Sequence, residues 1–262
     1  MIPLLKKLLS RPARPEPAAV RALAPPRPDT DLYVVGDVHG RRDLLVNLTE
    51  RLMVEVQASN REWRLIFVGD YIDRGEESAG VLPFLQALDR AEAGRVVCLL
   101  GNHEQMMLDF LDDPVAHGAK WLRYGGLQTL ASFGLRGTIT AEAGADTLRA
   151  VAQDFRRLLP AGLLDWVRAR PLSFSSGNVC VVHAGADPAL AMGAQTAEAL
   201  LWGHPQFRSV AREDGTWIVH GHSIVEAPSV AGGRIAIDTG AVFTGRLTAA
   251  AIYTDGVIDF AS

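Results

Sequence analysis

The sequence predicts an α/β fold, and three observations point to it. Short apolar runs alternate with stretches in which leucines recur at helical spacing. Each of the first three apolar runs ends in a polar, glycine-containing loop, as strands in βαβ units do. Of the 262 residues, 48% are hydrophobic and 21% are charged, which fits a globular chain and argues against a disordered or fibrous one. We therefore expect one domain with an embellishment.

The first 28 residues are expected to form a Pro/Ala-rich tail, and residues 29–262 the domain. The leucines of residues 1–10 surround Lys6 and Lys7, which interrupt any signal-peptide core, and the segment is too short to span a bilayer. A surface-docked or frayed turn is favoured over a weak membrane-surface anchor. Residues 11–28 indicate a linker or a semi-extended tail. We expect no transmembrane segment anywhere.

Three strands alternating with three helices are predicted next. The strands are the apolar runs at 32–35, 65–68 and 96–100, and the helices follow each of them. Because the order is β-α-β-α-β, the strands should be parallel neighbours with right-handed crossovers. Residues 112–170 are helical in pattern and are expected to form an insertion over the sheet edge. Strands resume at 179–182, 217–219, 234–237, 248–254 and 257–260, the last two flanking an Asp-Gly hairpin signal.

Polar metal-binding side chains follow five of these strands. They are Asp37, His39, Asp70, Asn102, His183 and His222. In an open α/β sheet the loops after the strands share one edge, where ligands bind. Oxygen and nitrogen ligands without thiolate suit manganese, iron or zinc, and six groups exceed the needs of one tetrahedral ion. The set fits two metal ions that share a carboxylate.

These motifs resemble those of the calcineurin-like metallophosphoesterases, and within them the bacterial and phage serine/threonine protein phosphatases. The resemblance is carried by GDVHG, GDYIDRG, GNHE, HAG and GHS, in that order, and by the segment IDTGAVFTGRLTA near the end. It runs from about Leu32 to the final hairpin. It implies a four-layer α/β/β/α sandwich of two mixed sheets flanked by helices.

The resemblance also assigns roles to individual residues. Asp37, His39 and Asp70 would hold the first metal, Asp70 would bridge, and the second metal would be completed by Asn102, His183 and His222. Two divalent ions, Mn²⁺ first with iron or zinc as alternatives, would supply a hydroxide for in-line attack on phosphorus without a phosphoenzyme.

Catalysis also needs groups that act on the leaving oxygen and on the phosphate. His103 would protonate the leaving oxygen, Asp73 would hold the imidazole of His103, and Arg74 would bind phosphate oxygens.

Three positions depart from the resemblance. Ile224 stands where the wider superfamily often has a further histidine ligand, which favours the protein-phosphatase branch. His204 replaces an arginine that clamps phosphate, so either His204 or Arg208 is expected in that role, or the clamp is weaker. Tyr124 stands where the subgroup tends to have asparagine, which bears on the substrate groove.

Other residues of the same types have simpler interpretations. His220, which ends its strand, is expected to be structural, and His117 should be solvated. Glu104 is expected to anchor its loop. The adjacent methionines at 106 and 107 are expected to pack a helix, and Cys98 and Cys180 to be core residues of a protein from a reducing cytoplasm.

Three functions compete. A protein serine/threonine phosphatase ranks first, a symmetrical dinucleoside-tetraphosphate hydrolase or other small-molecule phosphoesterase second, and a metal-free binding module third. The substrate would be a phosphoprotein or a small phosphorylated molecule, acted on by a monomer or weak oligomer. A net charge of −4 gives no reason to expect nucleic acid. Cysteine-nucleophile chemistry is disfavoured because Cys98 is followed six residues on by Glu104, and Cys180 by Ala186, where that phosphate loop needs arginine.

Overall fold

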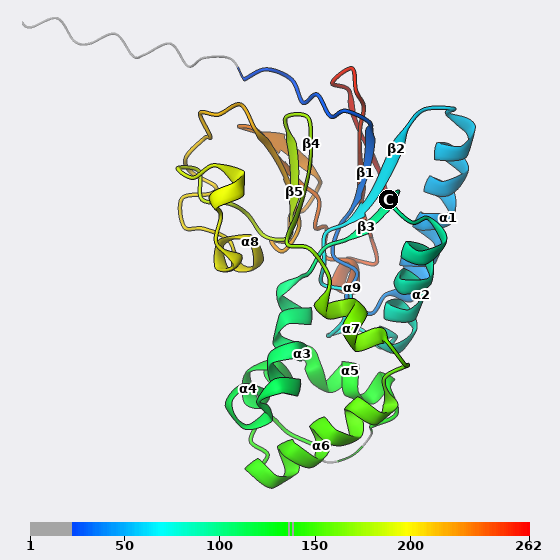
Figure 1. Ribbon diagram of the computed structural model, residues 1–262, viewed down its shortest axis with the longest axis vertical. Helices are drawn as coiled ribbons and strands as arrows, with labels where there is room; N and C mark the ends of the chain where they lie inside the picture. The colour runs from blue at the N-terminus through cyan, green and yellow to red at the C-terminus, as the bar shows by residue number, and fades with distance from the viewer. Residues whose placement is uncertain (1–22, 136, 138) are drawn as a thin grey trace, which may run out of the picture.

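The computed structural model describes residues 23–135, 137 and 139–262. Two five-stranded mixed sheets lie side by side, with helices outside them and a helical lobe at one end (Figure 1). The α/β prediction and the expected two-sheet sandwich are confirmed.

The first sheet has the order β10-β9-β1-β2-β3. Its strands are β1 (Asp31–Val35), β2 (Trp63–Phe67), β3 (Val96–Cys98), β9 (Ala249–Ile252) and β10 (Ile258–Ala261). The first three are parallel neighbours, as predicted, whereas β9 joins β1 in antiparallel fashion. Helices α1 (Arg42–Ala58) and α2 (Ser78–Ala91) cover its outer face.

The second sheet has the order β4-β5-β6-β8-β7. Its strands are β4 (Ser173–Ser176), β5 (Val179–Val182), β6 (Trp217–His220), β7 (Ser229–Ala231) and β8 (Arg234–Ala236). The central three are parallel, so their carboxyl ends share one edge. A 3₁₀ turn (Met192–Ala194) and helix α8 (Ala197–Trp202) lie outside this sheet, and the short helix α9 (Ala241–Thr244) precedes β9.

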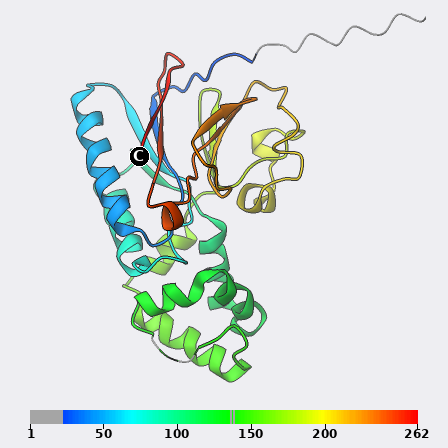
Figure 2. The same ribbon diagram turned by 180° about the vertical axis from the view of Figure 1, so that it is seen from behind.

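The helical lobe lies beyond the carboxyl ends of the first-sheet strands, as the views from both sides show (Figures 1 and 2). It consists of α3 (Asn102–Asp112), α4 (Pro114–Trp121), a π-helical turn (Leu122–Gly126), α5 (Leu127–Ser132), α6 (Ala145–Leu158) and α7 (Leu163–Arg168). No strand interrupts its described residues, which agrees with the predicted helical insertion. Its position puts it against the loops that carry the candidate site.

Alternation along the buried strands divides the core into layers. Leu32 and Val34 of β1 lie in the cluster between the sheets, whereas Tyr33 and Val35 join the cluster under α1 and α2. In β5, Cys180 likewise belongs to the cluster under α8. Because both faces of these strands are buried, their sequences are continuously apolar.

Some segments differ from expectation. The strands β4 and β7 were not predicted, because both are short and polar or exposed. Residues 23–28 pack on the second sheet: the indole of Trp217 donates to the Ala24 carbonyl at 2.8 Å, and Asn178 donates to the Pro25 carbonyl at 3.1 Å. The predicted surface turn or anchor at residues 1–10 lies outside the described residues. No helix in the described part of the chain is long and apolar enough to cross a membrane.

Candidate metal centre

The loops at the carboxyl ends of six parallel strands converge on one buried cluster. All six predicted metal ligands belong to these loops, and five of them are almost fully buried. Two sets of residues each bring three potential ligand atoms within 4.8 Å of one another. One set is His39, Asp70 and His103, and the other is Asp70, His183 and His222. Asp70 is common to both sets, as the bridging role predicted for it requires.

Backbone carbonyls fix two of the imidazoles. Nδ1 of His39 lies 2.8 Å from the Ile72 carbonyl, and Nδ1 of His183 lies 3.1 Å from the Val68 carbonyl. A carbonyl only accepts, so Nδ1 carries the proton in both rings and Nε2 is left to bind a metal. Nε2 of His183 faces Asp70 Oδ1 at 3.3 Å.

Asn102 and Asp37 complete the cluster. The Asn102 side-chain oxygen lies 2.8 Å from Nε2 of His183 and 3.0 Å from Nδ1 of His222. The backbone N–H of His222 donates to both carboxylate oxygens of Asp37, at 3.0 and 3.2 Å. Asp37 comes from the first sheet and His222 from the second, so the cluster joins the two sheets.

Backbone conformation marks the same loops. Among the described non-glycine residues six have positive φ, and five of these lie at the site, with φ between 45° and 71°. They are His39, Asp70, Asp73, Arg74 and His222. Side chains rarely adopt this region, and such residues persist where the surrounding structure determines them.

Glu104 holds the loops together from beneath. One carboxylate oxygen accepts from the backbone N–H groups of Asp70 at 2.8 Å and Gly101 at 3.1 Å, and the other accepts from Tyr71 at 2.8 Å and Ile72 at 3.2 Å. The loop-anchoring role predicted for Glu104 is confirmed.

The electrostatics of the cluster favour cations. Burial, together with the nearby Asp238 and Asp70 carboxylates, raises the pKa of Asp37 well above its usual range. Burial would also raise the pKa of Asp70, but the neighbouring imidazoles outweigh it and hold that pKa well below its usual range. Burial lowers the pKa of His39 to about 3 and that of His222 to about 4, so both rings are neutral donors of a lone pair. Buried carboxylates beside neutral imidazoles fit divalent metal ions.

His103 and Asp73 form a buried pair beside these ligands. Nδ1 of His103 lies 2.6 Å from Asp73 Oδ2, and the two carboxylates of Asp70 and Asp73 raise the pKa of His103 against the opposing effect of burial. The Arg74 guanidinium lies 2.9 Å from Nε2 of His39 and 3.1 Å from Nε2 of His103. The groups expected to act on the leaving oxygen and on phosphate are therefore adjacent to the ligand cluster.

The other predicted site residues lie further out. His204 contacts its own loop, accepting from the Gln206 N–H at 3.3 Å and lying 3.7 Å from Asp187. Arg208 is exposed on the same loop. Tyr124 is half exposed, with its ring centroid 6.4 Å from that of His103.

The histidines predicted to be bystanders also have identifiable surroundings. His220 packs against Phe207 and stays outside both ligand sets, and His117 is exposed. Cys98 and Cys180 are buried free thiols, as expected.

Three residues at the site were missed. Asp238 follows β8, is 4% exposed, and is the strongest charged neighbour of Asp37. An Asp after an apolar strand is the signal that identified Asp37 and Asp70, so the same rule would have found it. Trp121 and Thr129 both donate to the Asp73 carboxylate. These contacts span 48 and 56 residues, so no local sequence pattern predicts them.

Comparisons with known proteins show the family to which the chain is related. The family model of the calcineurin-like phosphoesterases matches residues 31–226. The bis(5'-nucleosyl)-tetraphosphatase PrpE [asymmetrical] of Bacillus velezensis is 30% identical over 236 residues, covering 82% of this chain and 86% of the relative. A symmetrical bis(5'-nucleosyl)-tetraphosphatase of Methylococcus capsulatus is 32% identical, covering 64% of this chain and 47% of the relative. A crystal structure assigned provisionally as a diadenosine tetraphosphatase superposes with a TM-score of 0.60 at 21% identity, covering 89% of this chain and 95% of that one.

Proposed function

Because the chain belongs to the calcineurin-like phosphoesterase family, we propose that it is a metal-dependent hydrolase of dinucleoside polyphosphates. The observation that carries the substrate class is the similarity to bis(5'-nucleosyl)-tetraphosphatases along 82% of the chain. This reverses the order expected from the motifs, in which a protein serine/threonine phosphatase ranked first.

The proposed metal ligands are Asp37, His39, Asp70, Asn102, His183 and His222. When bound, two divalent cations supply the charge that lowers the pKa of water and neutralises phosphoryl oxygens. The chain supplies the rest: as hydroxide bonds to phosphorus and the bond from phosphorus to the leaving oxygen breaks, the electron pair of the broken bond stays on the leaving oxygen, which takes a proton from Nε2 of His103. Asp73 holds the opposite nitrogen of that ring at 2.6 Å. Arg74 presents paired donors to phosphate oxygens.

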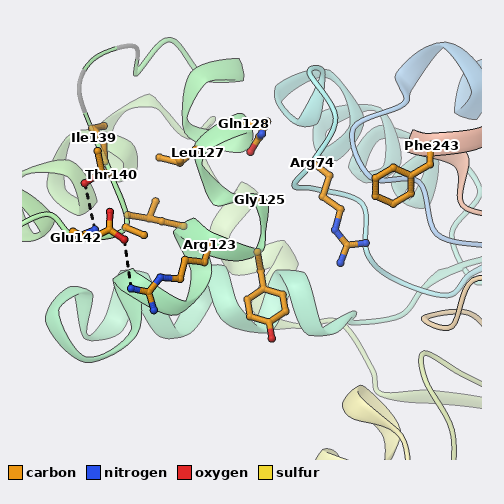
Figure 3. Close-up of a pocket in the computed structure, with 12 residues that line it drawn as sticks. Arg74, Arg123, Gly125, Leu127, Gln128, Ile139, Thr140, Glu142 and Phe243 are labelled. Atoms are coloured by element: carbon orange, nitrogen blue, oxygen red, sulfur yellow. Dashed lines mark hydrogen bonds and ion pairs between the residues drawn. The ribbon is translucent and has the colours of Figure 1, made fainter.

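A cavity beside Arg74 supports a nucleotide as substrate. It has a volume of about 680 Å³ and is lined by residues that include Arg74, Arg123, Tyr124 and Phe243. Figure 3 shows the Arg74 guanidinium between the lobe residues and Phe243 of α9. Aromatic rings and guanidinium groups suit a base and a phosphate chain, so we place one nucleotide end of the substrate here.

A lysine side chain lies near the side of the site that the second sheet forms. The Trp202 ring lies 6.3 Å from the His222 ring, and Nζ of Lys120 lies 4.3 Å from the Trp202 ring centroid. Lys120 therefore joins His204 and Arg208 as a proposed ligand of the distal phosphates. Lys120, His204 and Arg208 can each be replaced by alanine. The replacement of a residue that binds a distal phosphate should raise KM for a tetraphosphate more than for a monophosphate ester.

A protein phosphatase is the second candidate. Ile224, which stands where the wider superfamily often has a further histidine ligand, favours it and is half exposed beside the site. A cavity open to solvent would also admit a phosphorylated side chain.

The test compares both substrate classes on one preparation. Metal-stripped protein restored with Mn²⁺ is given diadenosine tetraphosphate and phosphoserine or phosphothreonine peptides, with Asp70→Asn as the inactive control. Faster cleavage of the tetraphosphate supports the proposal, and its products distinguish asymmetrical cleavage (AMP and ATP) from symmetrical cleavage (two ADP). Faster release of phosphate from the peptides overturns it in favour of the second candidate.

A further inference from the structure

The Asp73 carboxylate is held by more than the imidazole it supports. Oδ2 accepts from Nδ1 of His103 at 2.6 Å and from Nε1 of Trp121 at 3.0 Å. Oδ1 accepts from the Thr129 hydroxyl at 2.6 Å. The same hydroxyl oxygen accepts from the Asp73 backbone N–H at 2.9 Å, so Thr129 binds this residue at both ends.

All four residues are shielded from water. Asp73, Trp121 and Thr129 are 0% exposed, and His103 is 1% exposed. In such surroundings a carboxylate depends on protein donors, and the directions of those donors fix the plane of the group. Trp121 and Thr129 therefore determine where Asp73 can hold the His103 ring.

Both donors come from the helical lobe, on either side of its π-helical turn. Trp121 ends α4 and Thr129 lies in α5. Between them, the carbonyl of Gly125 accepts from the backbone N–H of Arg74 at 3.4 Å. The π-helical turn thus lies between two donors to the Asp73 carboxylate and contacts the next residue along the chain; the indole of Trp121 is shared by the two oxygens, at 3.0 Å from Oδ2 and 3.2 Å from Oδ1.

We propose that Trp121 and Thr129 are positioning residues, which act through Asp73 to aim the His103 imidazole at the leaving oxygen. The proposal rests on the proposed role of His103, but not on which phosphate compound is the natural substrate. It makes the lobe a part of the catalytic machinery rather than a cover over it.

The first measurement uses leaving groups of different basicity. Trp121→Phe and Thr129→Val remove one donor each and keep the bulk of the side chain. A poor leaving group needs the proton, so kcat on phenyl phosphate should fall about tenfold or more, whereas kcat on 2,4-dinitrophenyl phosphate should change by less than about twofold. Equal losses on both esters would indicate a merely structural role and would overturn the proposal.

Matched controls exist elsewhere in the chain. Trp166→Phe removes another indole donor of the lobe. This indole donates to Asp89 over 2.7 Å, and the pair is not part of the site. Thr49→Val removes a buried hydroxyl that has no partner among the described residues. Neither control should change the ratio of the two rates.

A second measurement needs no turnover. In the wild type the proton on Nδ1 of His103 should give a downfield NMR resonance, assigned by its loss in His103→Gln. Trp121→Phe and Thr129→Val should shift or broaden this signal, and Trp166→Phe should not. An unchanged signal in both test variants contradicts the positioning role. If the wild type hydrolyses none of the phosphate esters while the signal responds as expected, the proposed function fails and the positioning of His103 stands.

Discussion

Glu104 lies at the centre of the candidate site without being one of its proposed ligands. Its two oxygens receive four backbone N–H groups from the loops after β2 and β3. Burial raises the pKa of Glu104 to about 7, and hydrogen bonds from the backbone act in the opposite direction. One carboxylate therefore sets the positions of Asp70 and Asn102.

Glu104→Gln should destabilise these loops. The amide puts an NH₂ group against two backbone donors, which leaves them without an acceptor, and we expect a loss of about 2–4 kcal/mol in the free energy of unfolding. Urea denaturation measures it, with the exposed Glu50→Gln as a control that should change little. A loss no larger than that of the control would mean that water replaces the carboxylate.

His220 provides a pH test that does not involve a proposed ligand. Burial lowers its pKa to about 4, so between pH 6.5 and 4 the unfolded chain binds a proton that the folded chain does not. Stability contributed by the neutral ring is present above pH 6.5 and is lost as pH falls. Between pH 7 and 4.5 the wild type should lose about 2–3 kcal/mol more than His220→Asn.

Denaturation curves at the two pH values give this difference directly, because the other histidines contribute equally to both proteins. The exposed His117→Asn should lose as much as the wild type. If His220→Asn loses as much too, then protonation of His220 does not drive acid unfolding.

Helices and strands can be predicted from the sequence where their own residue pattern is distinctive. The runs at β1, β2 and β5 are apolar because both faces of each strand are buried. β4 (Ser-Phe-Ser-Ser) and β7 (Ser-Val-Ala) are edge strands that depend on pairing with a neighbour, which composition does not reveal. The π-helical turn in the lobe was visible only as a Gly-Gly break.

The site divides along the same line. Residues that follow a strand directly, such as Asp37 and His183, are predictable because the strand and its loop are contiguous. Trp121 and Thr129 are not, since their contact with Asp73 arises from packing of the lobe. The assignment of metal ligands itself stays a prediction until metal binding is measured.

Gly125→Ala tests the π-helical turn. Gly125 has φ of 116°, and an added Cβ would lie 2.6 Å from the backbone nitrogen of Arg74 and 3.1 Å from the Asp73 Cβ. The loop carrying both residues must then move, so kcat should fall at least about tenfold, since small misplacements of catalytic groups have large effects.

Gly134→Ala is the matched control, because Gly134 also has positive φ (92°) and nothing lies within 4 Å of its added Cβ. It should cost about 1–2 kcal/mol of backbone strain and leave kcat unchanged. Equal effects of the two variants on kcat would show that strain in the lobe, rather than contact with Arg74, is responsible.

At the scale of the whole molecule, the candidate metal centre joins the two sheets through buried charges of one sign. Asp37 and Asp70 follow strands of the first sheet, and Asp238 follows β8 of the second. Without cations these carboxylates repel one another across the sandwich. Divalent metal should therefore raise the melting temperature by binding the folded state alone, and a chelator should reverse it.

Asp37→Asn separates the effect of this buried charge on the stability of the metal-free fold from its effect on metal binding. The folded state raises the pKa of Asp37, so the native chain binds more protons than the unfolded chain above the usual carboxyl range, and its stability falls as pH rises. The amide keeps an acceptor for the His222 N–H but carries no charge. The metal-free variant should therefore be more stable than the metal-free wild type by about 1–2 kcal/mol at pH 8, and the gain should shrink toward pH 5.

The same variant should lose the stabilisation by Mn²⁺ that we expect of the wild type, because a proposed ligand from the first sheet is missing. Chemical denaturation with and without Mn²⁺ at both pH values measures the two effects together, and the exposed Asp154→Asn should reproduce the wild type in each. A metal-free Asp37→Asn protein that is less stable than the wild type at pH 8 would show that the carboxylate is already compensated within the fold. The metal-free sandwich would then hold its buried carboxylates without a net cost in stability.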